Sequence, residues 1–416
     1  MTTSRNDMTS QQFSPQNHPL PPLFTRDYLA MVAANFMLYF GFWLLIPLLP
    51  FYLKETFDQN EASIGVILSL YTLAALAVRP FAAFLLDSFN RRWLWLVTYG
   101  LFTLAFLGYP LCGALVVFVG LRVMHGLAFG AVTVGGNTVV VDIMPSARRG
   151  EGLGYYGLAN NLAMSLGPMT GLLLHGRVSY DVIFVTAATA SSIGLALALG
   201  VKAPSGPMAR QGALSLDRFF LPKGIWAGLS LMLLSVPYGA TTNYVSVYVA
   251  QAGVAVQPGL FFVLLALGMG ASRIVAGRYV DRGLLIRCIA VGFYLVVAAF
   301  VLLGLCGPLA SSHKEWAVAA FVAAGALQGV GFGMMFPAFN TLFVRLAPHN
   351  RRATAVGTYL TSWDVGIGIG IAAAGAVAHG SSFSTVYLCG GIMALVSMAV
   401  FLGIAAPHFR KNALDD

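Results

Sequence analysis

Three ionisable residues lie inside long apolar stretches of the sequence. Asp364 lies within the stretch 353–378. Arg122 and His125 lie about one helical turn apart within 113–141. A carboxyl group in apolar surroundings favours its neutral form and a histidine titrates near neutrality, so both can exchange a proton, while a buried arginine needs a partner or a polar cavity. We therefore predict that Asp364, Arg122 and His125 couple proton movement to the function of this chain.

Each of these residues has a second interpretation that the sequence leaves open. Asp364 could contact a cationic substrate, or it could be hydrogen-bonded to Ser or Thr neighbours in a purely structural role. Arg122 lies in the outer part of its stretch, so its charged end could reach out to water. His125 could be a neutral residue packed in the core.

Other kinds of chemistry are missing from the sequence. It contains no G-x-x-x-x-G-K-[ST] loop for a nucleotide, no Cys and His spacing for a metal, and no Ser-His-Asp set for hydrolysis. The four cysteines are isolated in apolar stretches and are expected to pack as small apolar side chains. We therefore expect no enzyme activity, no cofactor and no metal, and we expect an ion gradient, with the proton favoured, to supply the energy.

The composition requires a membrane environment for these residues. Of the 416 residues, 58% are apolar and only 9% are charged, and the mean hydropathy is +0.78. We count about twelve apolar stretches long enough to cross a bilayer core of about 30 Å as helices. The sequence thus predicts an all-α integral membrane protein. The expected spans are 28–52, 63–86, 93–111, 113–141, 152–175, 182–201, 224–250, 258–280, 284–307, 316–343, 353–378 and 384–406.

The charges between the spans predict the orientation of the chain. Most Lys and Arg residues fall on alternate connections, and the opposite connections carry only Lys54, Arg177 and Lys314 as basic residues. Basic residues are enriched in cytoplasmic loops, so we expect a multi-pass protein of the cell (inner) membrane with both termini in the cytoplasm. The net charge of +9 therefore does not indicate binding to nucleic acid.

The second half of the sequence repeats the first. Shifts of 203 and 194 positions superpose matching residues, and two related halves in a membrane chain are typical of a transporter. The matches include Gly126 with Gly329, Asn137 with Asn340, Gly167 with Gly370, Arg79 with Arg273, and Asp87 with Asp281. The predicted organisation is a disordered cytoplasmic tail (1–25), a six-helix bundle (26–202), a cytoplasmic linker (203–221), a second six-helix bundle (222–407) and a cytoplasmic tail (408–416).

Charged residues at the cytoplasmic ends of the spans predict a latch. Asp87 can face the N-terminus of a neighbouring helix, and Arg91 can pair with Asp142, which would stabilise the state with the cytoplasmic ends together. In the second half Arg345 stands at the position matching Asp142, so that copy is expected to be broken. The alternative is that all these charges are merely solvated. The predicted latch residues are Arg79, Asp87, Arg91, Arg92, Asp142, Arg273, Asp281 and Arg282.

Three patterns resemble motifs of the major facilitator superfamily. The segment RPFAAFLLDSFNRR resembles its signature loop, R-P-x-x-G-x-x-x-D-R-x-G-R-R/K, and LRVMHGLAFG is similar to its L-x-x-R-x-x-Q-G pattern. The segment GYYGLANNLAMSLGPMTG resembles its antiporter motif. The resemblance implies twelve transmembrane helices in two pseudo-symmetric six-helix bundles, in the drug:proton antiporter-like exporter branch. The matching residues of the antiporter motif are Gly154, Gly167, Pro168 and Gly171.

The resemblance also implies where a substrate binds. In this family the first, fourth, seventh and tenth helices surround a central cavity, so their polar and aromatic residues are candidates for contacting the substrate. Two of them, Asn137 and Asn340, could instead belong to a cytoplasmic gate. The candidates are Asn35, Tyr39, Trp43, Asn137, Tyr238, Asn243, Tyr244, Gln328 and Asn340.

These features together predict a monomeric, proton-coupled exporter of small organic molecules that works by alternating access. Its expected partners are the substrate, protons and the lipid bilayer. The main alternative is a proton symporter that takes up a sugar or an organic anion, with Arg122 binding the anion. A membrane-embedded enzyme or a transporter-like receptor is a more remote alternative.

Overall fold

The computed structural model describes residues 21–145, 148–203, 220–348 and 351–414. Within these ranges the chain is helical and contains no strand, which confirms the all-α prediction. Helices of the first half are α1 (Arg26–Leu45), α2 (Leu49–Phe57), α3 (Glu61–Ser88), α4 (Arg91–Gly108), α5 (Leu115–Ile143), α6 (Arg149–Leu174) and α7 (Tyr180–Leu199). Those of the second half are α8 (Ile225–Ala252), α9 (Gly259–Asp281), α10 (Leu285–Ser312), α11 (Lys314–Arg345), α12 (Arg352–Gly380), α13 (Phe383–Val400) and α14 (Ala406–Asn412).

Eleven helical segments in the described part of the chain are long and apolar enough to cross a membrane. Helix α6 is not among them because its sequence is rich in Gly and contains Asn and charged residues. Its length of 26 residues matches that of the other spans, and it packs along α1 and α9. Helix α6 therefore completes a set of twelve spans by its position rather than by its hydropathy.

The first predicted span, 28–52, is broken into two helices in the structure. Helix α1 ends at Leu45 and α2 begins at Leu49. Pro47 lies in the break, where its missing amide hydrogen and its ring oppose a continuous helix. Asp58 then ends α2 with a positive φ of 48°, and the side chain of Asn60 caps the start of α3. Pro47 thus ends α1 early, and the chain turns toward α3 after Asp58.

The segment that resembles the signature loop, residues 79–92, is largely helical. Residues 79–88 continue α3, and only Phe89 and Asn90 separate α3 from α4. The Asn90 side chain accepts a hydrogen bond from the backbone amide of Trp93 at 3.2 Å, so it caps α4. Arg79 is consequently a residue of a membrane helix, and its surroundings differ from those of the charges at the helix ends.

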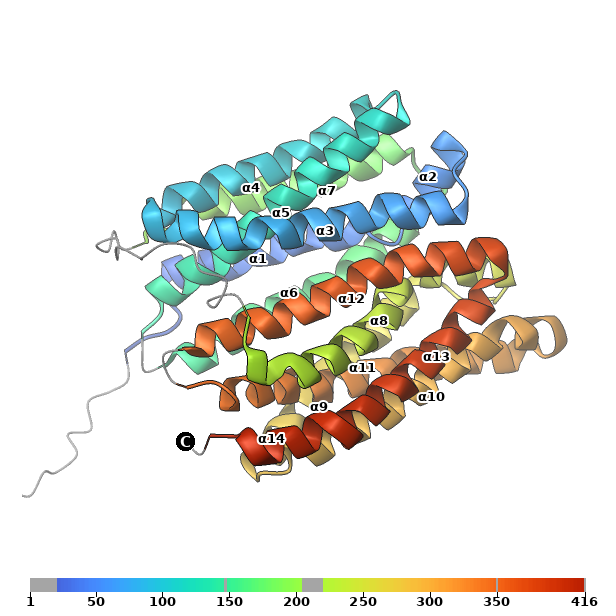
Figure 1. Ribbon diagram of the computed structural model, residues 1–416. Helices are drawn as coiled ribbons and strands as arrows, with labels where there is room; N and C mark the ends of the chain where they lie inside the picture. Colours follow the sequence, from blue (N-terminus) through green and yellow to red (C-terminus); the bar gives the residue numbers. More distant parts are fainter. Residues whose placement is uncertain (1–20, 146–147, 204–219, 349–350, 415–416) are drawn as a thin grey trace, which may run out of the picture.

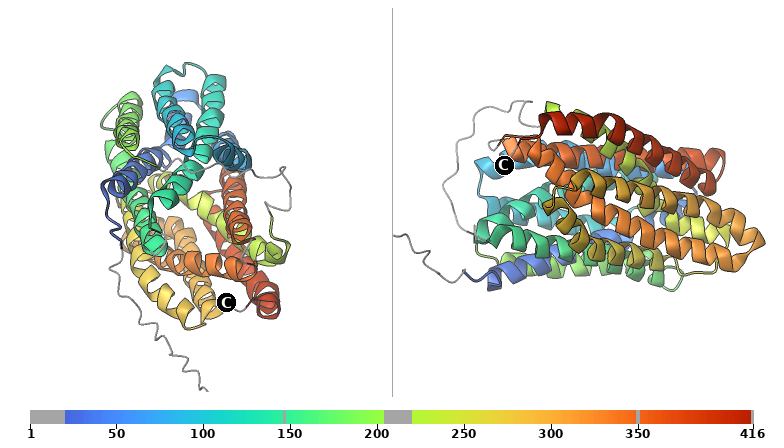
Figure 2. Two further views of the ribbon diagram at one scale, coloured as in Figure 1. Left: turned by 90° about the vertical axis from the view of Figure 1, so that its left-hand side faces the viewer. Right: turned by 90° about the horizontal axis from the view of Figure 1, so that it is seen from below.

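Two groups of helices lie side by side (Figure 1). Helices α1–α7 form one half and α8–α14 the other, and the views in Figure 2 show the same division. The halves meet along two seams, formed by α3 with α12 and by α6 with α9. We call the end of the molecule where α1 begins and α14 ends the terminal end, and the other end the distal end. The linker that joins the halves lies almost wholly outside the described residues.

The halves are in close contact at the distal end. A Cβ atom at Gly375 of α12 would overlap the carbonyl oxygen of Glu61 of α3, and one at Gly65 would lie 2.9 Å from the carbonyl oxygen of Ile371. The carboxylate of Glu61 also binds Lys54 at 2.9 Å and lies 3.7 Å from Nδ1 of His379 on the other half. Small residues therefore allow the two backbones to touch, and polar contacts surround the place where they meet.

Helices α3 and α12 diverge toward the terminal end. Figure 1 shows their ribbons separating toward the end that carries the C-terminus. Asn137 and Asn340, the repeat-related pair, are both exposed to solvent.

The contact at Gly375 yields a first prediction. Gly375→Val should force α3 and α12 apart at the distal end, because a side chain there overlaps backbone that cannot move aside. Pulsed electron spin resonance between labels at Thr56 and Ser381, in a background without native cysteines, should show a longer distance distribution.

The matched control is Gly380→Val, since a Cβ atom at Gly380 meets nothing within 4 Å. This control should keep the distances of the parent protein. Unchanged distances in Gly375→Val would contradict the account of the distal contact.

Candidate functional site

An ion pair between the two halves occupies the α3–α12 seam. Arg79 of α3 contributes Nη1, and Asp364 of α12 contributes Oδ2. The two side chains are only 24% and 17% exposed, respectively. Each charge therefore compensates the other inside a membrane helix, where an isolated charge is costly.

The sequence did not predict that these two residues pair with each other. Asp364 was expected to carry the coupling proton, to contact a cationic substrate or to be bound by Ser or Thr, and Arg79 was expected to act with the charges of the latch. The structure instead brings them together across the seam. The pair makes a contact between the halves depend on the charge of Asp364, because a proton on the carboxylate would remove the attraction.

Arg122 and His125 belong to a separate cluster inside the first half. Nη1 of Arg122 donates a hydrogen bond to the Tyr109 hydroxyl at 3.3 Å, and the same hydroxyl lies 2.8 Å from Nδ1 of His125. The guanidinium also lies over the ring of Tyr71, 4.1 Å from its centre. Arg122 is 3% exposed and His125 is 1% exposed, so Arg122 does not reach out to water.

This cluster retains unused polar atoms. Nε of Arg122, Nε2 of His125 and the Tyr71 hydroxyl are buried and have no hydrogen-bond partner in the described residues. His125 packs between Phe102 and Phe106, with ring centres 4.6 Å away in each case. The cluster thus holds a buried positive charge by hydrogen bonding and by the faces of aromatic rings. The cluster is built from α3, α4, α5 and Tyr109, all of the first half, whereas the Arg79–Asp364 pair joins the two halves.

The residues expected to contact substrate divide into two groups. Asn35 and Asn243 donate hydrogen bonds to backbone carbonyls, at 3.3 Å to Tyr156 and 3.1 Å to Gly239, so their amides are already engaged in packing the helices. Asn137 also donates a hydrogen bond to a backbone carbonyl, that of Thr133, at 3.0 Å. Other candidates keep polar atoms without a described partner or are partly exposed. The Gln328 amide, the Tyr244 hydroxyl and Nε1 of Trp43 have no described hydrogen-bond partner, while Asn137 and Asn340 are exposed and Tyr39 is half-buried.

Tyr238 connects the halves near the middle of the molecule. Its hydroxyl donates a hydrogen bond to Sδ of Met164 on α6 at 3.5 Å. Its ring packs against Trp363 and Phe332, with centres 4.9 and 4.8 Å apart. Phe336 joins this group at 4.6 Å from Trp363. We call Tyr238, Phe332, Phe336 and Trp363 the aromatic cluster of the second half.

A related cluster lies in the first half. Phe129, which the repeat superposes on Phe332, stacks on Phe42 with ring centres 4.5 Å apart. Phe129 also contacts Tyr39 and Tyr71 at 5.9 and 5.6 Å. The match of Phe129 with Phe332 was visible in the sequence, but aromatic residues are so abundant there that the match did not single them out.

The charged residues at the terminal end tie helices of one half together. Nη1 of Arg91 lies 3.0 Å from both carboxylate oxygens of Asp142, which joins α4 to α5. Nη2 of Arg92 donates a hydrogen bond to the carbonyl of Leu199 at 2.8 Å, which joins α4 to α7. Arg282 is exposed at the end of α9. The side chains of Asp87 and Asp281 lie outside the described part of the structure.

The glycines of the antiporter motif pack α6 against α1. A Cβ atom at Gly167 would lie 2.8 Å from Cβ of Trp43, and one at Gly171 would overlap the carbonyl oxygen of Leu44. Pro168 lies between them in α6, whereas Gly154 has open space around it. The observed contacts of this motif therefore lie within the first half.

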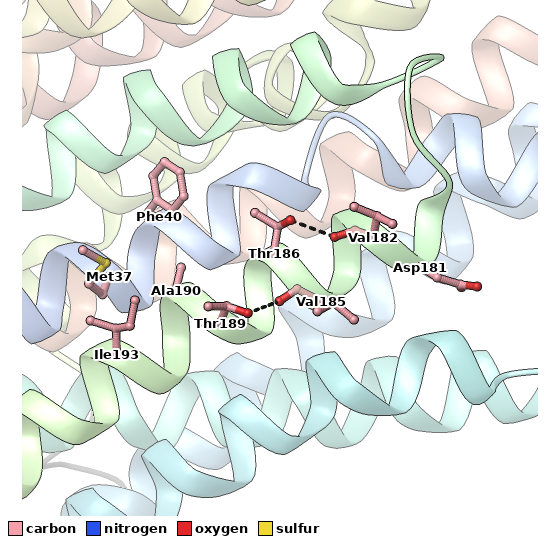
Figure 3. A pocket seen from close by; sticks show the side chains of 9 residues that line it. All are labelled: Met37, Phe40, Asp181, Val182, Val185, Thr186, Thr189, Ala190 and Ile193. Carbon is pink, nitrogen blue, oxygen red and sulfur yellow. Dashed lines mark hydrogen bonds between the residues drawn. The ribbon is translucent and has the colours of Figure 1, made fainter.

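A groove of about 490 Å³ between α1 and α7 is a poor candidate for the substrate site (Figure 3). Its lining is mostly apolar: Thr186 and Thr189 donate their hydroxyls to the carbonyls of Val182 and Val185, and the one carboxylate among the lining residues, Asp181, is exposed in the first turn of α7. Val185 is 48% exposed, so the groove lies on the outer surface of the first half. An apolar groove on the outside of a membrane bundle suits a lipid chain.

The family of this chain follows from its sequence as a whole. The sequence profile of the Major Facilitator Superfamily matches residues 31–320 and 295–414. The chain belongs to the major facilitator superfamily. This confirms the resemblance predicted from the three motifs, and it makes the protein a transporter of that family.

Individual relatives of this major facilitator protein are distant. The staphylopine export protein of Staphylococcus aureus (strain Mu50 / ATCC 700699) is 23% identical over 359 residues, which cover 83% of this chain and 88% of the relative. The maltose permease of Geobacillus stearothermophilus is 27% identical over 386 residues, covering 89% and 92%. A crystal structure of a POT family transporter in complex with a thioalcohol-conjugated peptide has a TM-score of 0.80 at 16% identity, covering 92% and 96%. The structural likeness confirms the fold.

The buried cluster of this transporter yields a second prediction. Tyr109→Phe removes the hydroxyl that joins Arg122 to His125, and leaves a buried guanidinium with one partner fewer. The variant should lose about 1–3 kcal/mol of stability, seen as a lower melting temperature of the purified protein in detergent.

Tyr155→Phe is the matched control, because Tyr155 is 42% exposed and its hydroxyl forms no hydrogen bond in the described structure. An equal melting temperature for Tyr109→Phe and Tyr155→Phe would show that the Tyr109 hydroxyl does not stabilise the cluster.

Proposed function

We propose that this transporter exports small organic molecules in exchange for protons, by alternating access between the two halves. Asp364 is the proposed proton carrier, and Arg79 is its counter-charge. The observation that supports this most directly is the ion pair between them, which joins the halves at the α3–α12 seam. Arg122 and His125 remain proposed contributors to coupling through their buried cluster.

The ion pair suggests how a proton can change the arrangement of the halves. With Asp364 ionised, the pair holds α3 to α12. A proton on Asp364 cancels its charge, frees Arg79 and weakens this seam. The protonated and ionised forms of Asp364 therefore favour different arrangements of the halves, and a bias of this kind is what couples ion movement to a conformational change.

Export is favoured over uptake by two observations. The antiporter motif is present on α6, and its Gly167 and Gly171 pack closely against α1. The staphylopine export protein is among the relatives. The maltose permease and the buried charge of Arg122 favour the alternative, which is proton-coupled uptake of a sugar or an organic anion.

The proposed setting is the cytoplasmic membrane, with both termini in the cytoplasm and the protein acting as a monomer. The terminal end carries the Arg91–Asp142 and Arg92–Leu199 contacts. These contacts tie α4 to its neighbours, so we propose that the latch keeps the first half rigid while the halves rock against each other.

The proposed coupling yields a third prediction. Inside-out proteoliposomes with an imposed proton gradient should accumulate fluorescent aromatic dyes, tested as cationic, neutral and anionic compounds. Asp364→Asn should abolish gradient-driven accumulation because the amide cannot bind the proton, yet it should retain exchange of dye across the membrane without a gradient.

Asp181→Asn is the control, since Asp181 is an exposed carboxylate outside the ion pair, and it should transport as the parent does. Gradient-driven accumulation that survives in Asp364→Asn would remove Asp364 as the carrier. Counterflow of sugars or organic anions without any dye movement would support uptake instead of export.

A further inference from the structure

The two seams between the halves carry different charges at equivalent positions. The repeat superposes Arg79 on Arg273 and Asn161 on Asp364. At the α3–α12 seam the structure pairs Arg79 with Asp364. At the α6–α9 seam the corresponding residues are Arg273 and Asn161, so an amide replaces the carboxylate that would balance the arginine.

Asn161 lies on the face of α6 that is turned toward the second half. One turn before it, a Cβ atom at Gly157 would lie 3.8 Å from Nη1 of Arg273. Nearly one turn after it, Met164 accepts the hydrogen bond of Tyr238 from the second half. Residues three or four positions apart share one face of a helix, so Asn161 faces the second half between these two contacts.

The side-chain nitrogen of Asn161 is an unused hydrogen-bond donor in the described structure. The residue is 9% exposed, and its side-chain nitrogen is buried without a hydrogen-bond partner in the described structure. A buried donor without a partner costs about 1–3 kcal/mol. The site is therefore incomplete without an acceptor.

Arg273 is also uncompensated. It forms no hydrogen bond or ion pair with any described residue, although it lies within the membrane helix α9. Tyr359 lies near enough to interact electrostatically with it, but a neutral phenol does not balance a positive charge. The α6–α9 seam thus presents a guanidinium and an amide nitrogen, which both donate hydrogen bonds and which together carry one positive charge.

A carboxylate has the chemistry that this pair lacks. It is negative, it only accepts hydrogen bonds, and its two oxygens match the planar donors of a guanidinium. We propose that Arg273 and Asn161 bind the carboxylate of the organic substrate, a proposal that rests on the transport function proposed above. The neighbouring aromatic cluster of the second half, reached through Tyr238, packs against the apolar body of that substrate.

The arrangement gives the substrate a structural role. Its carboxylate supplies at the α6–α9 seam the charge that Asp364 supplies at the α3–α12 seam. With Asp364 ionised and substrate bound, both seams carry a paired arginine. With Asp364 protonated and substrate absent, both arginines are unpaired. Protonation of Asp364 and release of the substrate therefore each remove one ionic contact between the halves, at opposite seams.

The test measures binding of 2-naphthoate to the purified transporter, with neutral 2-naphthamide of the same shape as the reference. Naphthoate should raise the melting temperature of the parent protein and naphthamide should not. Arg273→Gln should weaken the binding of naphthoate by about tenfold or more. Arg278→Gln is the matched control, because Arg278 is an exposed arginine on the same helix, and it should bind naphthoate as the parent does.

Asn161→Asp gives a second and opposite readout. The new carboxylate should pair with Arg273 as Asp364 pairs with Arg79. The variant should therefore melt at a higher temperature than the parent without ligand, and it should no longer respond to naphthoate. This result separates an anion site from a residue needed only for folding, because the protein becomes more stable while binding is lost.

Several results would overturn the proposal. In the parent protein, these results are equal shifts of the melting temperature by naphthoate and naphthamide, or no shift by either. In the variants, they are naphthoate binding as strong as the parent's by Arg273→Gln, or any naphthoate binding by Asn161→Asp. Stabilisation by phosphatidylglycerol alone, lost in Arg273→Gln, would assign the site to a lipid headgroup and would also overturn it. If naphthoate does not bind but dye transport still depends on Asp364, the proposed function stands and only the carboxylate site is refuted. If naphthoate binds but dye transport is the same in Asp364→Asn as in the parent, only the proton coupling is refuted.

Discussion

The cost of placing a charge in an apolar bundle is the constraint on which the rest of this structure depends. Each ionisable residue within the spans has to be neutralised, hydrogen-bonded or turned toward a polar space. The protein meets this requirement for three of these residues and leaves it unmet for a fourth. Arg79 and Asp364 neutralise each other, and Arg122 is held by Tyr109 and the ring of Tyr71. Arg273 lies where the halves meet and forms no hydrogen bond or ion pair with any described residue.

These solutions differ in what they let the protein do. The cluster around Arg122 lies within one half, so its contacts can stay intact while the halves move. The Arg79–Asp364 pair spans the halves, so its strength bears directly on how they are arranged. Close backbone contacts such as that of Gly375 with Glu61 set where the halves touch, and the charges set how readily they part.

Much of this architecture could be predicted from the sequence. Apolar stretches, basic connections and the internal repeat predicted the all-helical fold and its two halves, and the three motifs predicted the family. The break at Pro47 was missed because hydropathy averages over such a local feature. The partner of Asp364 could not be predicted, since Arg79 lies in the other half and no spacing along the chain encodes a contact between α3 and α12. The unpartnered side-chain nitrogen of Asn161 was missed for the same reason, because only the surrounding helices show that no described residue accepts a hydrogen bond from it.

The mismatch between the two seams has a consequence for how such a chain can arise. Two identical six-helix subunits, assembled as a symmetric pair, would place the same residue at positions 161 and 364. Both seams would then hold a carboxylate, or both would hold an amide. The two positions can differ only when the two copies are encoded separately, as the two halves of this chain are, and a change between Asp and Asn alters a side chain by little more than one atom. Two separately encoded halves are thus a precondition for seams that carry different charges.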